Sequence, residues 1–286
     1  MIIRTIFVPI RGDGKGEGVL DHAIALGRGG NVHIEVAHCR PRPEDLLPFG
    51  VFLTAAIKKQ ITSSASALAD EEERNLKGLF DDYCGRHGLV AVDTPPWPLD
   101  RMSASWREVT GKQASVIASH GRLADLIVVP RPDRSQNIGF NSLEAALFET
   151  GKPVLMCPPA PVAKIGDHVV IAWSSSAEAA RAVTLALPVL ESAKAITVLT
   201  VDTGDGAANG QELCDYLVSH GVDAGTKALT AGSSAVGGAL LKAAEEAGGD
   251  VLVMGAFGQN RRRELVLGGV TQHIIDHADL PILMAH

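Results

Sequence analysis

The sequence contains few cysteines, and their arrangement excludes several classes of site. The four cysteines, at positions 39, 84, 157 and 214, lie far apart and form no C-x-x-C pair. This spacing argues against a zinc knuckle, a thioredoxin-like redox centre and a secreted disulfide scaffold. Free cysteines fit a reducing compartment, so we expect a cytoplasmic protein.

Long apolar runs and export signals are also lacking. No apolar stretch reaches membrane-spanning length without a charge, a proline or a glycine. Residues 1–8 form a short apolar run without the basic n-region, long h-region and cleavage site of a signal peptide. We therefore expect no membrane association and no secretion.

Positive charge is scarce as well. Lys and Arg number 26 against 33 Asp and Glu, which gives a net charge of −7, and no basic stripe with interleaved aromatics is present. Arg261, Arg262 and Arg263 form the one tight basic cluster. Nucleic acid is therefore not expected as a partner.

What the sequence does contain is a long alternation of β-prone and helical segments. Strand segments that are apolar throughout, rather than alternating, indicate parallel sheets covered on both faces. In the first half, strands are expected at residues 4–10, 31–38, 89–93, 125–129 and 152–157, and helices at 18–27, 54–87, 115–120 and 143–149. In the second half, strands are expected at 168–173, 195–201, 224–229, 251–254 and 281–284, with helices at 178–190, 211–220, 235–247 and after 269. The charged residues 70–74 are expected on the exposed face of the long helix.

Two observations indicate an internal duplication. Residues 158–166 form a proline-rich hinge. Residues 125–129 are matched by 250–254, and residues 152–156 by 280–284. Two copies of one βαβαβ-type unit explain these matches better than one large sheet. With 286 residues, the chain is long enough for a buried core in each copy.

The most informative stretch is the strand, loop and helix near the end of the chain. An apolar run ends at Gly255 and Gly258, and a second glycine pair, Gly268 and Gly269, opens an amphipathic helix. Glycines without a Cβ let backbone N–H groups approach a phosphate, so this layout is typical of a phosphate cradle after a parallel strand. The alternative is that these glycines only make turns.

This segment resembles the universal stress protein family, whose motif here is Gly-x2-Gly-x9-Gly-Ser/Thr. Gly255, Gly258 and Gly268 keep the spacing, whereas Gly269 stands where the nucleotide-binding members carry Ser or Thr. The missing hydroxyl removes one donor to a phosphate oxygen, on the order of 1 to 3 kcal/mol. The resemblance continues through Val270 and Thr271.

The resemblance implies an α/β fold of two Rossmann-like, adenine nucleotide alpha hydrolase-like domains. Each would have a five-stranded, mostly parallel sheet flanked by helices, at residues 1–160 and 167–286. The nucleotide would lie across the carboxyl ends of the first and fourth strands, in agreement with the general rule for open α/β sheets. Domains of the family pair through their last strands, so residues 153–157 and 281–285 are expected to pair within the chain. The result would be an intramolecular pseudo-dimer, and a homodimer is left open.

In the second copy, the resemblance implies a site for ATP or a related adenine nucleotide, with or without Mg²⁺. Ser174 matches the family's Asp that contacts adenine, and it cannot supply a carboxylate. Val201 matches a position whose backbone meets the base, although an ordinary strand-end valine is an equal alternative. The arginines at 261–263 fit either a phosphate clamp or a solvated loop. The predicted binding residues are Ala172, Ser174, Val201, Met254, Gly255, Gly258, Gly268, Gly269, Val270 and Thr271.

The first copy departs further from the family pattern. Arg11 stands in place of the Asp, and prolines at 130 and 132 replace the first glycine pair. Proline has no N–H to offer a phosphate and fixes its own φ, so this loop cannot make the same cradle. We therefore expect only the second copy to hold a nucleotide, with the first as a pairing and regulatory partner or a binder of something else.

Three other patterns in the sequence are typical of chemical sites. The glycine-rich residues 12–18 fail the dinucleotide fingerprint because Glu17 stands at its third glycine, so a polar loop is favoured. His273 and His277 are four apart on one helix but lack the Glu of H-E-x-x-H, which favours a surface pair over a metal site. The serines at 174–176 suggest a nucleophile, yet no partner base can be assigned from the sequence.

Three function classes follow. The first is a tandem universal stress protein that acts as a nucleotide-responsive binding module without committed turnover. The second is a stress scaffold that binds no nucleotide and works through protein–protein pairing. The third is enzymatic, at most a slow ATPase, for which the sequence offers no evident general base.

Overall fold

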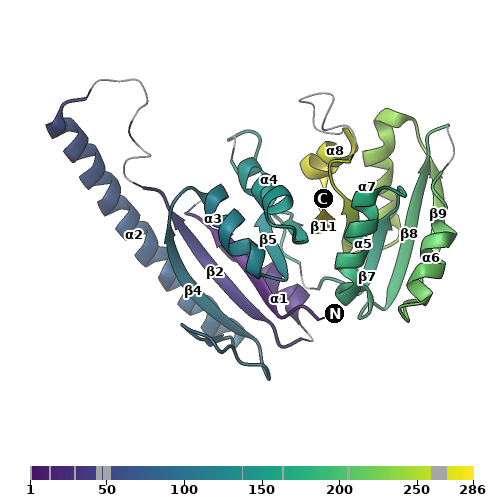
Figure 1. The fold of residues 1–286 in the computed structure, drawn as a ribbon, viewed down its shortest axis with the longest axis horizontal. Helices are drawn as coiled ribbons and strands as arrows, with labels where there is room; N and C mark the ends of the chain where they lie inside the picture. Colours follow the sequence, from purple (N-terminus) through teal and green to yellow (C-terminus); the bar gives the residue numbers. More distant parts are fainter. Residues whose placement is uncertain are drawn as a thin grey trace.

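The computed structural model describes residues 2–12, 14–28, 30–42, 47, 53–136, 138–162, 164–204, 207–258 and 269–286. Within these ranges, eleven strands join into one sheet that runs through both halves of the chain (Figure 1). The strand order is β3-β4-β2-β1-β5-β6-β11-β10-β7-β8-β9. The first half of the sequence therefore builds one side of the sheet, and the second half builds the other.

The strands of the first half are β1 Thr5–Ile10, β2 His33–Arg40, β3 Val90–Ala91, β4 Ser103–Thr110, β5 Leu126–Pro130 and β6 Val154–Cys157. Those of the second half are β7 His168–Ala172, β8 Ala195–Asp202, β9 Gly225–Thr230, β10 Val251–Gly255 and β11 Ile282–Ala285. The helices are α1 Gly16–Gly27, α2 Ala55–His87, α3 Gln113–His120, α4 Phe140–Glu149, α5 Ala177–Leu190, α6 Gly210–Val218, α7 Val236–Glu246 and α8 Gly269–His277. Two short 3-10 turns, η2 Gly121–Leu123 and η3 Ser233–Ala235, complete the order.

Both halves have the same strand order, which the sequence did not predict. In the second half, β9-β8-β7-β10-β11 are parallel neighbours, so the first and fourth strands of the copy, β7 and β10, lie side by side. The first half repeats this order as β4-β2-β1-β5-β6, with the two-residue strand β3 added at the edge. The predicted α/β fold is confirmed, with a mostly parallel, helix-flanked set of strands in each half, and the two sets join into one sheet.

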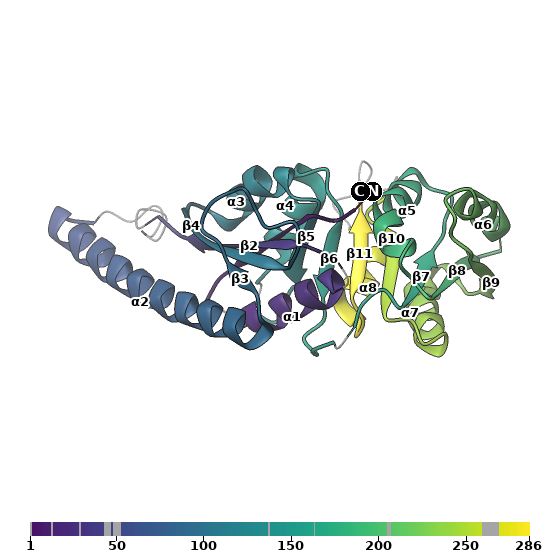
Figure 2. The same cartoon turned by 90° about the horizontal axis from the view of Figure 1, so that it is seen from below.

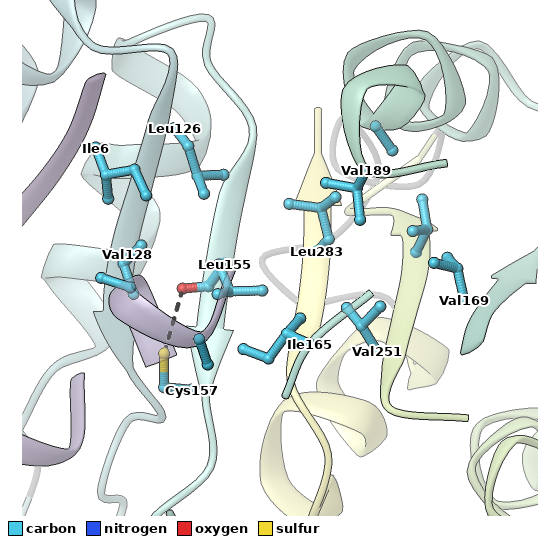
Figure 3. Close-up of a cluster of buried hydrophobic side chains, with 14 of the residues drawn as sticks. Ile6, Leu126, Val128, Leu155, Cys157, Ile165, Val169, Val189, Val251 and Leu283 are labelled. Carbon is cyan, nitrogen blue, oxygen red and sulfur yellow. Dashed lines mark hydrogen bonds between the residues drawn. The ribbon is translucent and has the colours of Figure 1, made fainter. Parts of the chain in front are cut away.

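The two half-sheets meet through their last strands. β11 pairs with β6 in antiparallel register, with Ile282 opposite Met156, Leu283 opposite Leu155 and Met284 opposite Val154. The pairing expected between residues 153–157 and 281–285 is therefore present within one chain. Buried side chains of both halves, among them Leu155, Ile165 and Leu283, share one apolar cluster at this seam (Figure 3).

Helices cover both faces of the sheet, as the apolar strands require (Figure 2). One face packs against α1, α2, α5 and α6, and the other against α3, α4, α7 and α8. Alternate residues of the same strand serve the two cores: Ile6 and Val8 belong to the first, and Phe7 to the second. Within the described ranges, no helix combines the length and apolarity needed to cross a membrane.

Two aspartates at equivalent positions of the internal repeat make the same kind of contact in the two halves. Asp250 precedes β10, and its carboxylate accepts the backbone N–H groups of Gly166, Asp167 and His168 at 2.8–3.1 Å. In the first half, Asp125 accepts those of Arg4 and Thr5 at 2.8 and 2.9 Å. Each carboxylate thus fixes the start of the copy's first strand beside the start of its fourth.

The sequence analysis missed one strand and met one expectation only in part. The predicted third strand at 89–93 is only the short, exposed β3, and the true third strand of the first half is β4. The charges at 70–74 were expected on the exposed face of α2: Asp70, Glu71 and Arg74 are exposed, whereas Glu72 and Glu73 are half-buried. Asp70, Glu72 and Glu73 also contact basic side chains at the end of β2.

Candidate functional site

A cavity of about 480 Å³ opens at the carboxyl ends of the second half's strands. Its walls come from the ends of β7, β8 and β10, the first turns of α5 and α8, and the start of α7. The strand order reverses direction between β7 and β10, and such points in open α/β sheets are the usual place of a ligand. The volume lies within the range of small-molecule sites, roughly 300–1,000 Å³.

The cavity brings together most of the residues that the sequence singled out. Eight of the ten predicted residues line it: Ala172, Ser174, Val201, Met254, Gly255, Gly258, Val270 and Thr271. Gly269 opens α8 but is exposed and does not line the wall. Gly268 and the arginines at 261–263 lie outside the described residues.

Gly255 and Gly258, the two motif glycines among the described residues, are favoured at their positions for different physical reasons. A Cβ on Gly255 would lie 2.4 Å from the backbone nitrogen of Ala179 and 2.6 Å from the carbonyl carbon of Glu178. Only a glycine lets α5 pack this closely against β10. A Cβ on Gly258 would instead meet the Glu178 carboxylate at 3.4 Å, next to the cavity. Packing therefore accounts for Gly255, whereas Gly258 leaves space at the cavity wall.

The turn after β10 is held by a threonine. Phe257 adopts a left-handed conformation with φ of 55°, and its N–H donates to Oγ1 of the buried Thr271 at 3.2 Å. The Phe257 ring packs on Phe148 of α4 with 5.3 Å between ring centroids. Phe148 also contacts His286, whose Nδ1 lies 2.9 Å from the Ala256 carbonyl oxygen. The first half of the chain thus supports the turn that borders the cavity in the second half.

The serine run after β7 builds the start of α5. Ser175 has φ of 56°, and Ser176 is the N-cap, whose Oγ accepts the N–H of Ala179 at 3.1 Å. Ser174 Oγ donates to Ser176 Oγ at 3.2 Å. These serines are therefore engaged with one another and with the helix end, and no histidine lines the cavity among the described residues.

The electrostatics of the cavity combine opposing features. The N-termini of α5 and α8 both border it, and helix N-termini present unpaired N–H groups and positive potential that favour anions. Glu178, in the first turn of α5, is the one charged side chain on the described wall. Its Oε2 is buried and makes no hydrogen bond, and neither does the buried Nε1 of Trp173 beside it.

The sequence analysis missed Glu178 and Trp173 as cavity residues. Trp173 lies between two residues that were predicted, so its position next to Ser174 was an available signal. Glu178 gave no signal of a ligand site, because acidic residues are common in the first turn of a helix, where they interact favourably with the helix dipole. Only the approach of α5 to β10 at Gly255 brings its carboxylate to the cavity.

The corresponding edge of the first half is filled by charged side chains. Glu72 of α2 accepts the backbone N–H of Gly12 at 2.7 Å and lies 3.5 Å from His38 Nε2. Arg40, at the end of β2, contacts Asp70 at 2.6 Å. Arg40 also contacts Glu73 and Glu108, at 3.7 and 3.3 Å. A hydrogen bond to Glu108 and then burial raise the pKa of Glu73.

The loop after β5 has a different role from the loop after β10. Arg131 follows the first proline of this loop and donates to the carbonyl oxygen of Ala278 at 2.7 Å. Arg134 donates to Asp276 of α8 at 2.7 Å. In the first half, therefore, this loop binds the second half of the chain.

The histidine pair of α8 is packed rather than aimed at a shared point. His273 and His277 stack with ring centroids 4.3 Å apart, and a Cβ on Gly237 of α7 would lie 2.9 Å from His273. Over the described part of the chain, no group of three His, Cys, Asp or Glu residues is placed to hold a metal ion.

Residues 225–286 match the sequence model of the Universal stress protein family. A solved universal stress protein from Archaeoglobus fulgidus DSM 4304 superposes with a TM-score of 0.69 at 16% identity, covering 98% of this chain and 95% of that one. Curated proteins give no match to this sequence.

Two structures from Pseudomonas aeruginosa are also similar. A functionally unknown protein from strain PAO1 has a TM-score of 0.55 at 16% identity, over 99% of this chain and 92% of that one. A candidate universal stress protein from strain UCBPP-PA14 has a TM-score of 0.54 at 16% identity, over 99% and 93%. The end of the second half thus matches the Universal stress protein family model, and the whole chain shares the two-domain fold of a solved universal stress protein.

Proposed function

We propose that the protein is a stress-response module whose second half binds an adenine nucleotide of the ATP type. The observation that carries the proposal is the cavity at the carboxyl ends of β7 and β10, because eight residues chosen from the sequence alone line it. These residues come from four separate parts of the chain, and a set of glycines that only made turns would have no reason to meet there.

The cavity offers different chemistry for the two ends of a nucleotide. Val201, Val236, Leu240 and Met254 give an apolar surface on which a base can pack. The turn at Gly258 and the N-termini of α5 and α8 offer backbone N–H groups for phosphates. Ser174 supplies a hydroxyl where a carboxylate would select adenine more strongly, so we expect modest discrimination between purine bases.

We further propose that the two halves act as domains of residues 1–160 and 167–286 with separate roles. The charged contacts of Arg40 and Glu72 fill the edge of the first half, and the loop after β5 docks onto α8. This supports a first domain that holds the second in place and binds no nucleotide. No turnover is proposed beyond a slow ATPase, and a cytoplasmic location and a homodimer stay predictions.

Binding is tested by calorimetry with purified protein, ATP and Mg²⁺, comparing wild type with Gly258→Val. The φ of Gly258 lies outside the left-handed region, so a side chain is accepted there while it fills the space next to the cavity. Gly225→Val is the matched control, because a Cβ at this position on β9 meets nothing within 4 Å. We expect micromolar binding by wild type and the control, and a loss of at least tenfold in Gly258→Val.

A second candidate function is a stress scaffold that binds no nucleotide. The observation in its favour is the unpaired Glu178 carboxylate on the cavity wall, since a negative charge there opposes a free phosphate. Wild type that shows neither heat nor a thermal shift with ATP and Mg²⁺ would favour this alternative. Mass spectrometry of small molecules that co-purify with the protein gives an independent reading.

A further inference from the structure

The unpaired carboxylate of Glu178 needs a partner that the described wall does not supply. It stands in the first turn of α5, and its Oε2 is buried without a hydrogen bond. A Cβ on Gly258 would lie 3.4 Å from that same oxygen, so the carboxylate faces the turn that borders the proposed phosphate position. Glu178 as a residue is half-buried, but an oxygen atom that is itself buried and unpaired is unfavourable unless a bound group pairs with it.

The charge of the missing partner follows from the ligand. A nucleotide phosphate is negative, and two negative groups a few ångströms apart repel each other most strongly where water is excluded. The carboxylate and the phosphates can share one cavity if a cation lies between them. Mg²⁺ is commonly held in this way, by one or two carboxylates together with substrate phosphates and water.

The other donors of the wall fit a hard cation. The oxygen-bearing side chains on the described wall are Ser174, Ser176, Glu178, Thr203, Ser233 and Thr271, and no thiol or imidazole is among them. A carboxylate and hydroxyls without thiol or imidazole suit Mg²⁺ better than softer transition metals. Among the described residues no cluster of three protein ligands is present, so these residues without the phosphates supply too few anionic groups to hold the ion tightly.

We propose that Glu178 is the protein ligand of a Mg²⁺ ion that enters with the nucleotide, so that the cavity takes the metal–nucleotide complex and rejects the metal-free form. This inference rests on the proposed nucleotide binding of the second half. It assigns a specificity-determining role to a residue outside the glycine motif. It also explains why a cavity lined by two helix N-termini carries a negative charge.

The test is a four-way comparison of ATP binding by calorimetry. Wild type and Glu178→Gln are each titrated with ATP, once with Mg²⁺ and once with EDTA. In wild type we expect Mg²⁺ to tighten binding by at least tenfold. In Glu178→Gln the amide no longer repels the phosphates and is a poorer ligand for Mg²⁺, so the ratio of the two affinities should fall by at least tenfold.

Controls separate this inference from the function on which it rests. Glu191→Gln removes an exposed carboxylate at the opposite end of α5 and should keep the wild-type ratio. Thermal melts check that both variants fold. Equal Mg²⁺ dependence in wild type and Glu178→Gln, or equally tight binding of adenosine and of metal-free ATP, overturns the inference while nucleotide binding stands. No binding of ATP by any variant in either buffer overturns the proposed function together with the inference.

A metal titration tests whether the ion binds only together with the nucleotide. Mn²⁺, followed by electron paramagnetic resonance, should bind wild type weakly without nucleotide and much more tightly with ATP. Tight Mn²⁺ binding by the protein alone contradicts entry of the ion with the nucleotide.

Discussion

Replacing Gly255 by alanine tests whether the first glycine of the motif is there for packing. The new Cβ would lie 2.4 Å from the Ala179 nitrogen and 2.6 Å from the Glu178 carbonyl carbon, both of which are backbone atoms of α5. A side-chain neighbour could rotate away, but these atoms move only if the whole helix shifts from β10. Overpacking of this kind costs about 1–3 kcal/mol, and we expect the upper end of that range.

The assay is chemical denaturation of wild type, Gly255→Ala and Gly258→Ala side by side. Gly258→Ala places its Cβ only against the flexible end of Glu178, so its free energy of unfolding should stay within about 0.5 kcal/mol of wild type. The two variants also separate stability from binding, because Gly258→Ala should weaken ATP binding without loss of stability. A Gly255→Ala protein as stable as Gly258→Ala would refute the packing explanation of this glycine.

Three further predictions concern pH, the repeat and the contact between the halves. Burial lowers the pKa of His33 to about 4, below the ordinary 6.5, so the neutral ring is favoured in the folded state. The stability that the neutral His33 ring contributes is present above pH 6.5 and is lost as the pH falls toward 4. Between pH 7.5 and 4.5 the loss in the free energy of unfolding amounts to about 2 kcal/mol. In His33→Gln, the unfolding midpoint should therefore depend less on pH. Asp250→Ala leaves three backbone N–H groups without their acceptor and should lower the free energy of unfolding by about 1–3 kcal/mol in urea titrations, whereas the exposed substitution Asp215→Ala should not. Phe148→Ala removes the aromatic contact that supports Phe257; an aromatic pair contributes about 0.5–1.5 kcal/mol, so ATP affinity measured by calorimetry should fall by up to about tenfold, and an unchanged affinity would show that the first half does not support the site.

Buried strands were predictable because their sequence is apolar on both faces. β1, β5, β7 and β10 fall close to their expected ranges for this reason. β4 was missed because only its first residues are buried on both sides, and Arg107 and Glu108 interrupt the apolar pattern near its end. A strand near the edge of a sheet carries a weaker signal than a central one.

The site was predictable where a residue acts through its backbone or its lack of a side chain. Gly255 and Gly258 keep the spacing of the family motif, and Thr271 followed from its place after the second glycine pair. Glu178 acts through its side chain, and the direction of that side chain depends on how α5 meets β10, which no local pattern records. The contacts of Asp70 and Glu73 were not foreseen for the same reason, because their partner Arg40 comes from a distant strand.

The antiparallel seam between β6 and β11 has a consequence for the integrity of the molecule. Each of these strands would be an open edge if its half stood alone, and an open edge is a template for pairing with another chain. A cut in the connection between β6 and β7 would leave two fragments held together by backbone hydrogen bonds and a shared apolar cluster. The same geometry allows fragments from different molecules to exchange, so that a nicked protein can persist as a hybrid of two parents.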